Sequence, residues 1–186
     1  MPASFGFVVK AQRGASIRAL YADPGESIPW LTESLPEFGE RLGAVLFRVP
    51  GEVARNDDRL GAMLAAWPRA IPLVLEAQHP SWQVDETFAA LRAAGAVLCT
   101  TDLDEQEDVP DIRRTGPFLY LRLRRTAYDE AGLDAWARRL VPFTDDGLDA
   151  YVLFRHDEDG TSALHAEGFA ARVERVREEG CRLIDC

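Results

Sequence analysis

The sequence contains almost no lysine and little cysteine, and it has no long apolar run. Lys10 is the single lysine among 21 basic residues. The three cysteines, Cys99, Cys181 and Cys186, are an odd number and include no C-x-x-C pair. This usage favours reduced thiols over a disulfide framework or a structural zinc site. No apolar run approaches the roughly 20 residues that span a bilayer, and Met1–Gly6 shows no secretory signal pattern. We therefore expect a cytoplasmic location and no membrane partner.

The sequence also has fewer basic than acidic residues. The chain has 21 basic and 31 acidic side chains, so its formal net charge is −10. This balance argues against sequence-independent attraction to nucleic acid or to an anionic membrane, because that attraction requires an excess of positive charge. It is compatible with a local basic pocket. The sequence also lacks a P-loop, a G-x-G-x-x-G and a G-x-S-x-G motif, so it gives no local support for a nucleotide cofactor or a serine hydrolase.

The composition is that of a globular protein. Of the 186 residues, 47% are hydrophobic and 28% are charged, which argues against disorder. No Gly/Ser linker divides the chain, so we expect a single domain over residues 1–186 with a sizeable core. The length falls short of the roughly 250 residues of a complete eight-stranded βα barrel.

Strands and helices alternate along the chain. Short apolar runs rich in β-branched residues predict six strands, at Phe5–Lys10, Ala44–Val49, Ile71–Gln78, Ala96–Asp102, Phe118–Arg124 and Ala150–Arg155. Apolar residues spaced three and four apart predict four amphipathic helices, at Asp57–Trp67, Val84–Ala94, Asp129–Leu140 and Ala163–Arg177. A short helix is expected around Glu37–Leu42, with Pro36 in its first turn. Long irregular connections are expected at Ala11–Ile28 and Leu103–Pro117. The alternation predicts βαβ crossovers and an α/β fold with a parallel sheet.

Charged residues interrupt the strands near their carboxyl ends. Side chains two residues apart share a face of a strand. In Phe118–Arg124, one face carries three leucines and the other a tyrosine and two arginines: Leu119, Leu121 and Leu123 against Tyr120, Arg122 and Arg124. The leucines fit under covering helices, so the opposite face should look into a barrel interior or a cleft.

Ligands bind at the carboxyl ends of parallel strands in barrels and in open α/β sheets. Eight polar or charged side chains would gather there: Lys10, Arg48, Glu76, Gln78, Asp102, Tyr120, Arg122 and Arg124. One interpretation is a network of buried ion pairs that closes the core. The favoured one is a ligand site, because uncompensated buried charge is costly and concentrates at functional sites. The excess of arginine over carboxylate indicates an anionic ligand such as phosphate or carboxylate.

The histidines permit a second kind of site. His79 begins the sequence His79-Pro80-Ser81-Trp82, where Ser81 can cap the next helix and His79 either stabilises the turn or takes part in chemistry. His156 and Asp157 follow a strand and could bind a metal together with Glu76 and Asp102. The absence of an H-x-x-x-H or similar spacing makes the metal the weaker hypothesis. His165 is expected on a solvated helix face.

The order and spacing of these motifs resemble the YecE-like family, known as domain of unknown function 72, from Phe5 to about Val176. The resemblance is carried by Phe7-x-x-Lys10-Ala11, Leu42-Gly43-x-Val45-Leu46-Phe47-x-x-Pro50, Leu60, Leu64, Pro68, Glu76-x-x-His79-Pro80-Ser81-Trp82, Asp102, Thr115, Phe118-x-Tyr120-x-Arg122-Leu123, Tyr128, Trp136, Tyr151-Val152-x-Phe154-x-x-Asp157, Gly160, Ala163 and Ala166. It implies a TIM-barrel-like (βα) fold, and it implies no established reaction.

Several pocket positions depart from the family pattern. Arg48 replaces the usual glutamine, Gln78 the usual arginine, Arg124-Arg125 the usual His-Gly and Arg155-His156 an Asn pair. The family also begins with a further strand–helix portion that has no counterpart here, so we expect an incomplete barrel. Its first strand, Phe5–Lys10, would then be an exposed edge that needs cover. A homodimer could provide that cover, or a short strand formed by Cys181–Cys186 after a helix stop at Gly180.

The sequence thus predicts a protein that binds a small anionic or phosphate-bearing ligand at its strand ends. If the protein is an enzyme, analogy with barrel enzymes favours hydrolysis or isomerisation of a phosphorylated or sugar-like substrate. Glu76 and Asp102 are the candidate general bases, and no cofactor is assigned. The expected ligand-binding residues are Lys10, Arg48, Gln78, His79, Trp82, Tyr120, Arg122, Arg124, Tyr128, His156 and Asp157. The alternatives are a metal-dependent enzyme and a catalytically silent binding module, including one that stacks nucleic-acid bases on Tyr120, Tyr128 or Trp82.

Overall fold

The computed structural model describes residues 5–155 and 159–184, with side chains up to residue 180. By its internal contacts the chain forms two compact units. Unit 1 comprises Met1–Cys99 and Arg114–Pro117, and unit 2 comprises Thr100–Arg113 and Phe118–Cys186. The division falls within strand β4 (Val97–Asp102), so this strand contributes residues to both units.

The predicted parallel sheet is confirmed. Its strands are hydrogen-bonded in the order β1-β2-β3-β4-β5-β6, which is also their order along the chain. Strands β1, β2, β3 and β4 pair in parallel in unit 1, and β5 pairs in parallel with β6 in unit 2. The strands span Phe7–Lys10 (β1), Leu42–Val49 (β2), Leu73–Ala77 (β3), Val97–Asp102 (β4), Leu119–Leu123 (β5) and Ala150–Phe154 (β6).

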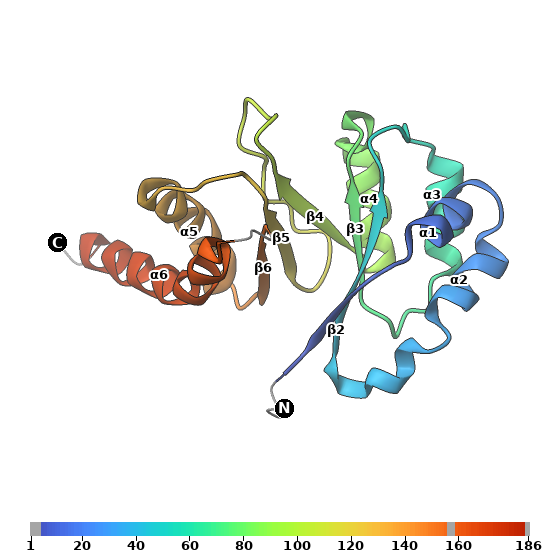
Figure 1. Ribbon diagram of the computed structural model, residues 1–186, viewed down its shortest axis with the longest axis horizontal. Helices are drawn as coiled ribbons and strands as arrows, with labels where there is room; N and C mark the ends of the chain where they lie inside the picture. The colour runs from blue at the N-terminus through green and yellow to red at the C-terminus, as the bar shows by residue number, and fades with distance from the viewer. Residues whose placement is uncertain (1–4, 156–158, 185–186) are drawn as a thin grey trace. The chain divides into compact units, whose positions relative to one another are not determined.

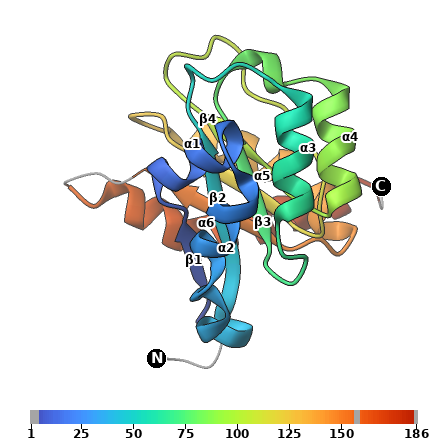
Figure 2. The ribbon, with the colours of Figure 1, turned by 90° about the vertical axis from the view of Figure 1, so that its right-hand side faces the viewer.

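The core of unit 1 lies between the sheet and its helices. Alternate residues of the strands, such as Val45, Phe47, Leu75 and Leu98, belong to one buried cluster with residues of the helices. Figure 2 shows α3 (Asp57–Ala66) and α4 (Asp85–Ala94) side by side over this part of the sheet. Both helices confirm the predicted amphipathic segments, because their apolar stripes supply Leu60, Met63, Phe88 and Leu91 to the core.

The expectation of an irregular connection over Ala11–Ile28 was wrong. This segment contains α1 (Arg13–Tyr21) and leads into α2 (Pro24–Thr32). The side chain of Gln12 accepts from the N–H of Ala15, and that of Asp23 accepts from Gly25 and Glu26, so each helix begins at a polar cap. The apolar periodicity of α1 is weak, and α2 contains Pro24, Gly25 and Pro29, residue types typical of loops, so the pattern in the sequence missed both helices. The short helix expected near Glu37 is a 3-10 helix, η1 (Leu35–Arg41).

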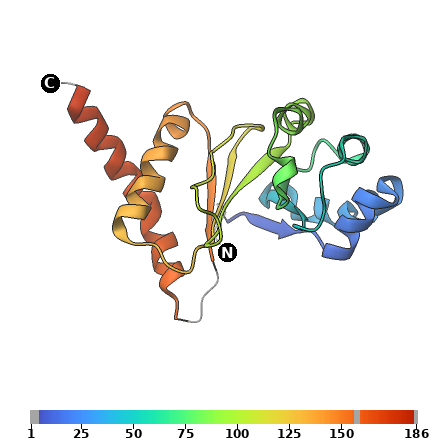
Figure 3. The same ribbon diagram turned by 90° about the horizontal axis from the view of Figure 1, so that it is seen from above.

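Unit 2 confirms the predicted two-faced strand. Leu119, Leu121 and Leu123 are buried in a cluster with α5 (Glu130–Asp145) and α6 (Thr161–Ile184). Figures 1 and 3 show these two helices packed together on one side of β5 and β6. The predicted helix stripe Leu133, Trp136, Ala137 and Leu140 is the side of α5 that enters this core.

The C-terminal part of the chain differs from its prediction. Helix α6 continues through Gly180 to Ile184, so most of the Cys181–Cys186 segment is helical and does not form the expected strand. A glycine in a helix interior costs about 1 kcal/mol relative to alanine, which neighbouring turns can outweigh. In the described residues, β1 has only β2 as a neighbour in the sheet, so the homodimer predicted to cover this edge stays a prediction. No helix in the described part of the chain is long and apolar enough to cross a membrane.

Candidate functional site

In unit 1 the predicted residues lie at or just after the carboxyl ends of β1, β2 and β3. Arg48 and Glu76 are register partners on adjacent strands, and the Arg48 Nε atom lies 3.6 Å from Glu76 Oε2. Their side chains differ in exposure, 36% for Arg48 and 1% for Glu76. The Arg48 Nε atom is itself buried and has no hydrogen-bond partner among the described residues. Lys10 at the end of β1 is exposed, and Gln78 follows β3 and is half-buried.

The segment after β3 is held by local hydrogen bonds. His79 Nδ1 accepts from the N–H of Ser81 at 3.2 Å and lies 2.8 Å from the Ser81 hydroxyl, which identifies the turn-stabilising role of this histidine. Ser81 does not cap α4 as expected, because its hydroxyl accepts from the N–H of Arg55. Trp82 is fully buried and donates from Nε1 to Val53 O at 2.8 Å. It is therefore a packing residue of unit 1 and offers no surface for a ligand or a base.

In unit 2 the polar face of β5 is opposite the leucine face. Tyr120 is buried, with its ring centroid 6.2 Å from that of Tyr151 on β6, and Arg122 is half-buried. Arg124 follows the strand, and its N–H donates to Asp102 O at 3.0 Å. The predicted alternation within Phe118–Arg124 is therefore confirmed. His156 and Asp157 lie outside the described residues.

Asp102 is a buried carboxylate of unit 2 that binds donors from three different side chains. It is 1% exposed and accepts from Arg125 Nε at 2.7 Å on Oδ1. On Oδ2 it accepts from the Tyr128 hydroxyl at 2.8 Å and from Trp136 Nε1 at 3.2 Å. Asp102 shares a face of β4 with Leu98, and its partner Trp136 belongs to the helix-covered core. Its side chain therefore points toward α5, whereas Glu76 lies on the face of β3 opposite the buried Leu75.

These contacts alter the ionisation of the donors. The hydrogen bond to Asp102 raises the pKa of the Arg125 guanidinium, so this residue stays charged. Burial raises the pKa of the Tyr128 hydroxyl well above its usual range, and the bond to Asp102 adds to this effect. Tyr128 is therefore a proton donor at neutral pH and not a phenolate nucleophile.

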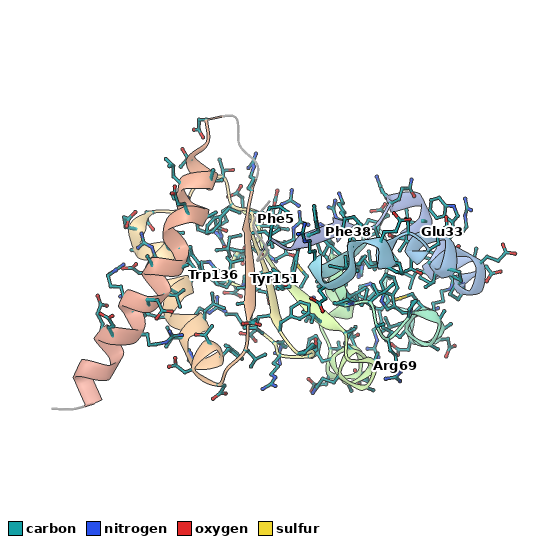
Figure 4. The ribbon with its side chains drawn as sticks, turned by 90° about the horizontal axis from the view of Figure 1, so that it is seen from below. Phe5, Glu33, Phe38, Arg69, Trp136 and Tyr151 are labelled. Carbon is teal, nitrogen blue, oxygen red and sulfur yellow. The ribbon has the colours of Figure 1, made fainter. Side chains whose placement is uncertain are left out.

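A pocket of about 690 Å³ opens beside this cluster. It lies where β4 and β5 end and α5 begins, entirely within unit 2. Its lining combines a polar cluster, apolar and small residues, and two arginines: Asp102, Val109, Arg125, Ala127, Tyr128, Asp129, Gly132, Ala135, Trp136 and Arg139. Figure 4 shows the labelled Trp136 between α5 and the strands.

Arg139 is held over the indole of Trp136. Its guanidinium carbon lies 4.4 Å from the ring centroid, and Nη2 donates to Pro110 O at 2.5 Å. No acidic side chain pairs with Arg139 in the described part of the chain, and its buried Nη1 has no acceptor there. Arg125, by contrast, is already neutralised by Asp102.

Sequence reasoning found Asp102 and Tyr128 but missed Arg125, Trp136 and Arg139 as site residues. Arg125 lies beyond the end of β5, where the alternation of faces no longer assigns a direction. The spacing of Trp136 and Arg139 by three residues puts them on the same side of a helix, which is the one signal that could have suggested their stacking.

The described residues contain no group of three or more His, Cys, Asp or Glu side chains that could hold a metal ion. The metal hypothesis involved His156 and Asp157, for which the structure gives no position, so it stays untested.

The chain matches the family model described as a protein of unknown function, DUF72, over residues 1–182. It is similar to the crystal structure of a DUF72 family protein from Thermotoga maritima, with 22% identity, a TM-score of 0.78, and coverage of 94% of this chain and 75% of that one. It is also similar to a DUF72 family protein from Enterococcus faecalis, with 19% identity, a TM-score of 0.74, and coverage of 95% and 79%. No curated protein matches. The resemblance inferred from the motifs is thus confirmed, and the chain belongs to the DUF72 family of proteins of unknown function.

Proposed function

We propose that this protein binds a small anionic ligand in the unit 2 pocket, at the carboxyl ends of β4 and β5. The observation that carries the proposal is Arg139, a cation that lines the pocket and has no acidic partner among the described residues. A guanidinium offers five N–H donors in a fork that matches carboxylate and phosphate oxygens. A ligand anion would supply the acceptors that the protein does not.

The rest of the lining restricts the ligand. Val109, Ala127 and Ala135 are apolar, and the largely buried Trp136 contributes to the wall. A volume of about 690 Å³ falls within the ordinary range for small-molecule sites, which are mostly apolar with a few polar groups that fix orientation. The best match is a phosphate or carboxylate joined to a compact apolar body.

The geometry supports binding more than a reaction. Asp102, one of the two candidate bases, is 1% exposed and already accepts three hydrogen bonds from protein donors, so its oxygens are poorly accessible to a substrate. Glu76 is buried next to Arg48. Stacking of nucleic-acid bases is disfavoured, because Trp82 and Tyr120 are buried and Tyr128 is half-buried with its hydroxyl bonded to Asp102.

We also propose that the fold is TIM-barrel-like and that the whole chain is a single domain. Parallel strands that follow one another in chain order are typical of a barrel wall, whereas doubly wound sheets reverse their strand order. The family match over residues 1–182 includes both units, which supports treating them as one domain.

The test is thermal unfolding in a phosphate series, with chloride at equal ionic strength as reference. A ligand that binds only the folded state stabilises it by mass action, so phosphate at ten times its Kd should add about 1.4 kcal/mol. For a chain of this size that corresponds to an increase of about 3–5 °C in the melting temperature. The variant Arg139→Gln should lose this phosphate-dependent increase. The exposed neighbour Arg138 does not line the pocket, so Arg138→Gln should keep it.

A third variant separates this site from the polar face of β5. If Arg124→Leu loses the phosphate-dependent increase while Arg139→Gln retains it, the anion binds near Arg124 and the pocket assignment is wrong. If phosphate stabilises neither the wild type nor any of the variants, anion binding is rejected.

A further inference from the structure

A second pocket lies in unit 1, between α1 and α2, and shares no residue with the pocket beside Asp102. Its volume is about 490 Å³, and it is lined by Gln12, Gly14, Ala15, Arg18, Glu26, Ser27 and Trp30. Helices α1 and α2 follow one another in the sequence and pack against each other, as Figure 2 shows. The bond from Ala15 N–H to Gln12 Oε1, at 2.6 Å, fixes the start of α1 at one end of this pocket.

Trp30 distinguishes this pocket from an ordinary surface depression. It is 60% exposed, whereas the other three tryptophans, Trp67, Trp82 and Trp136, are 6% exposed or less. Isolated exposed apolar side chains are normal, but an indole at the wall of a pocket is a large rigid surface for a ligand.

The polar lining has unused hydrogen-bonding capacity. Ser27 is 96% buried, since its relative exposure is 4%, and its hydroxyl has no hydrogen-bond partner among the described residues. A buried hydroxyl without a partner costs about 1–3 kcal/mol. The side chains of Arg18 and Glu26 are exposed and also make no hydrogen bond or ion pair with any described residue.

This combination defines the chemistry of the ligand. Arg18 and Glu26 contribute one charge of each sign, so the pocket has no net preference for an anion or a cation. Together with Ser27 they offer strong donors and strong acceptors, which suit a molecule with several hydroxyl groups. The negative face of an indole attracts C–H groups, which carry a partial positive charge. A pyranose ring presents both a C–H face and hydroxyl groups at its rim.

We infer that this pocket binds a neutral sugar, with its C–H face on Trp30 and its hydroxyl groups on Arg18, Glu26 and Ser27. Gly14 leaves room for the cap at this wall, because a Cβ there would lie 3.1 Å from the Gln12 Oε1 atom that caps α1. The site is independent of the anion pocket proposed above.

The experiment uses Trp30 as its own reporter, because it is the one exposed tryptophan of the four. The whole chain is titrated with methyl glycosides of glucose, galactose, mannose and xylose, and quenching of tryptophan fluorescence by acrylamide is measured. We expect at least one glycoside to reduce quenching in a saturable manner. Saturation-transfer NMR on the same glycoside should show contact in the wild type and none in Trp30→Ala.

Two variants and one control complete the test. Glu26→Gln should weaken binding about tenfold, which corresponds to the loss of a charge-assisted hydrogen bond, and Ser27→Ala should also weaken it. Glu33, labelled in Figure 4 at the end of α2, is exposed and outside the pocket, so Glu33→Gln should bind like the wild type. The inference is overturned if no glycoside protects Trp30, if protection is unchanged in Glu26→Gln and Ser27→Ala, or if phenol protects Trp30 and the glycosides do not.

Discussion

Asp102 is the acceptor at the centre of the buried polar cluster in unit 2. A buried carboxylate is stable only when its oxygens accept enough hydrogen bonds to replace those of water. Asp102 meets this requirement with donors from three side chains, Arg125, Tyr128 and Trp136. The cluster joins the end of β4 to the start of α5, and so it fixes one wall of the pocket proposed for an anion.

Tyr128 allows this cluster to be tested through pH. An unfolded tyrosine ionises near pH 10, whereas burial and Asp102 keep the pKa of Tyr128 higher in the folded protein. Above pH 10 the unfolded chain loses this proton and the folded one retains it, so the free energy of unfolding should fall as pH rises. In Tyr128→Phe, the part of this decrease in the free energy of unfolding that comes from Tyr128 should be absent. At pH 8 the variant should be less stable by about 1 kcal/mol, the value of one hydrogen bond.

Urea unfolding between pH 8 and pH 11 measures both effects. The matched control is Tyr21→Phe, because Tyr21 is 41% exposed, belongs to α1 in unit 1 and makes no contact with Asp102 among the described interactions. Parallel curves for wild type and Tyr128→Phe above pH 10 would contradict the role assigned to this hydroxyl.

At the level of elements, a side chain satisfies backbone hydrogen bonds at the start of β4. Thr115 is buried, and its hydroxyl accepts from Leu98 N–H at 2.7 Å while donating to Ala96 O at 2.9 Å. The adjacent Gly116 passes so close that a Cβ there would lie 2.6 Å from Val97 Cγ2. In the segment Arg114–Pro117 of unit 1, position 116 therefore requires a residue without a Cβ, and position 115 uses its hydroxyl to bond the start of β4.

Thr115→Val should destabilise the protein by about 2–3 kcal/mol, because it leaves a buried N–H and a buried carbonyl without partners at nearly unchanged volume. Chemical denaturation measures the loss. Thr126→Val is the control, since Thr126 is exposed and its hydroxyl bonds to the exposed Asp104, so the variant should lose less than 1 kcal/mol. Equal losses in the two variants would show that Thr115 does not complete β4 as described.

At the level of the whole molecule, each unit has a hydrophobic core of its own. One is built around Phe47, Leu75 and Trp82, and the other around Leu121 and Trp136. The two units nevertheless share β4, whose residues Val97–Cys99 belong to one and Thr100–Asp102 to the other. A strand that contributes to both units should couple their unfolding.

We therefore predict one cooperative unfolding transition. Hydrogen exchange followed by mass spectrometry should give the same opening free energy for amides of Leu73–Ala77 in unit 1 and Leu119–Leu123 in unit 2. Denaturation curves from tryptophan fluorescence and far-ultraviolet circular dichroism should coincide. Two separate opening free energies would mean that the units unfold independently and would contradict the single domain.

Local pattern was enough to predict most of the fold. The short apolar runs rich in β-branched residues located the strands to within two residues at each end, and the apolar stripes located α3, α4, α5 and most of α6. The apolar stripe of α1 was too weak to detect, and the prolines and glycine of α2 are typical of a loop, so the two helices that line the pocket proposed for a sugar were missed. Their capping residues Gln12 and Asp23 were the remaining signal.

The sequence by itself determined the class of the fold, the two-faced character of β5 and the family, because each depends on the order and spacing of residues along the chain. Only the tertiary structure decided that Asp102 pairs with Arg125, that Trp82 is packed inside, and that Arg139 lines a pocket with no acidic partner in the part of the chain that the structure describes. These features involve residues on different elements or beyond a strand end. There the direction of a side chain is set by packing, and no periodicity along the chain records it.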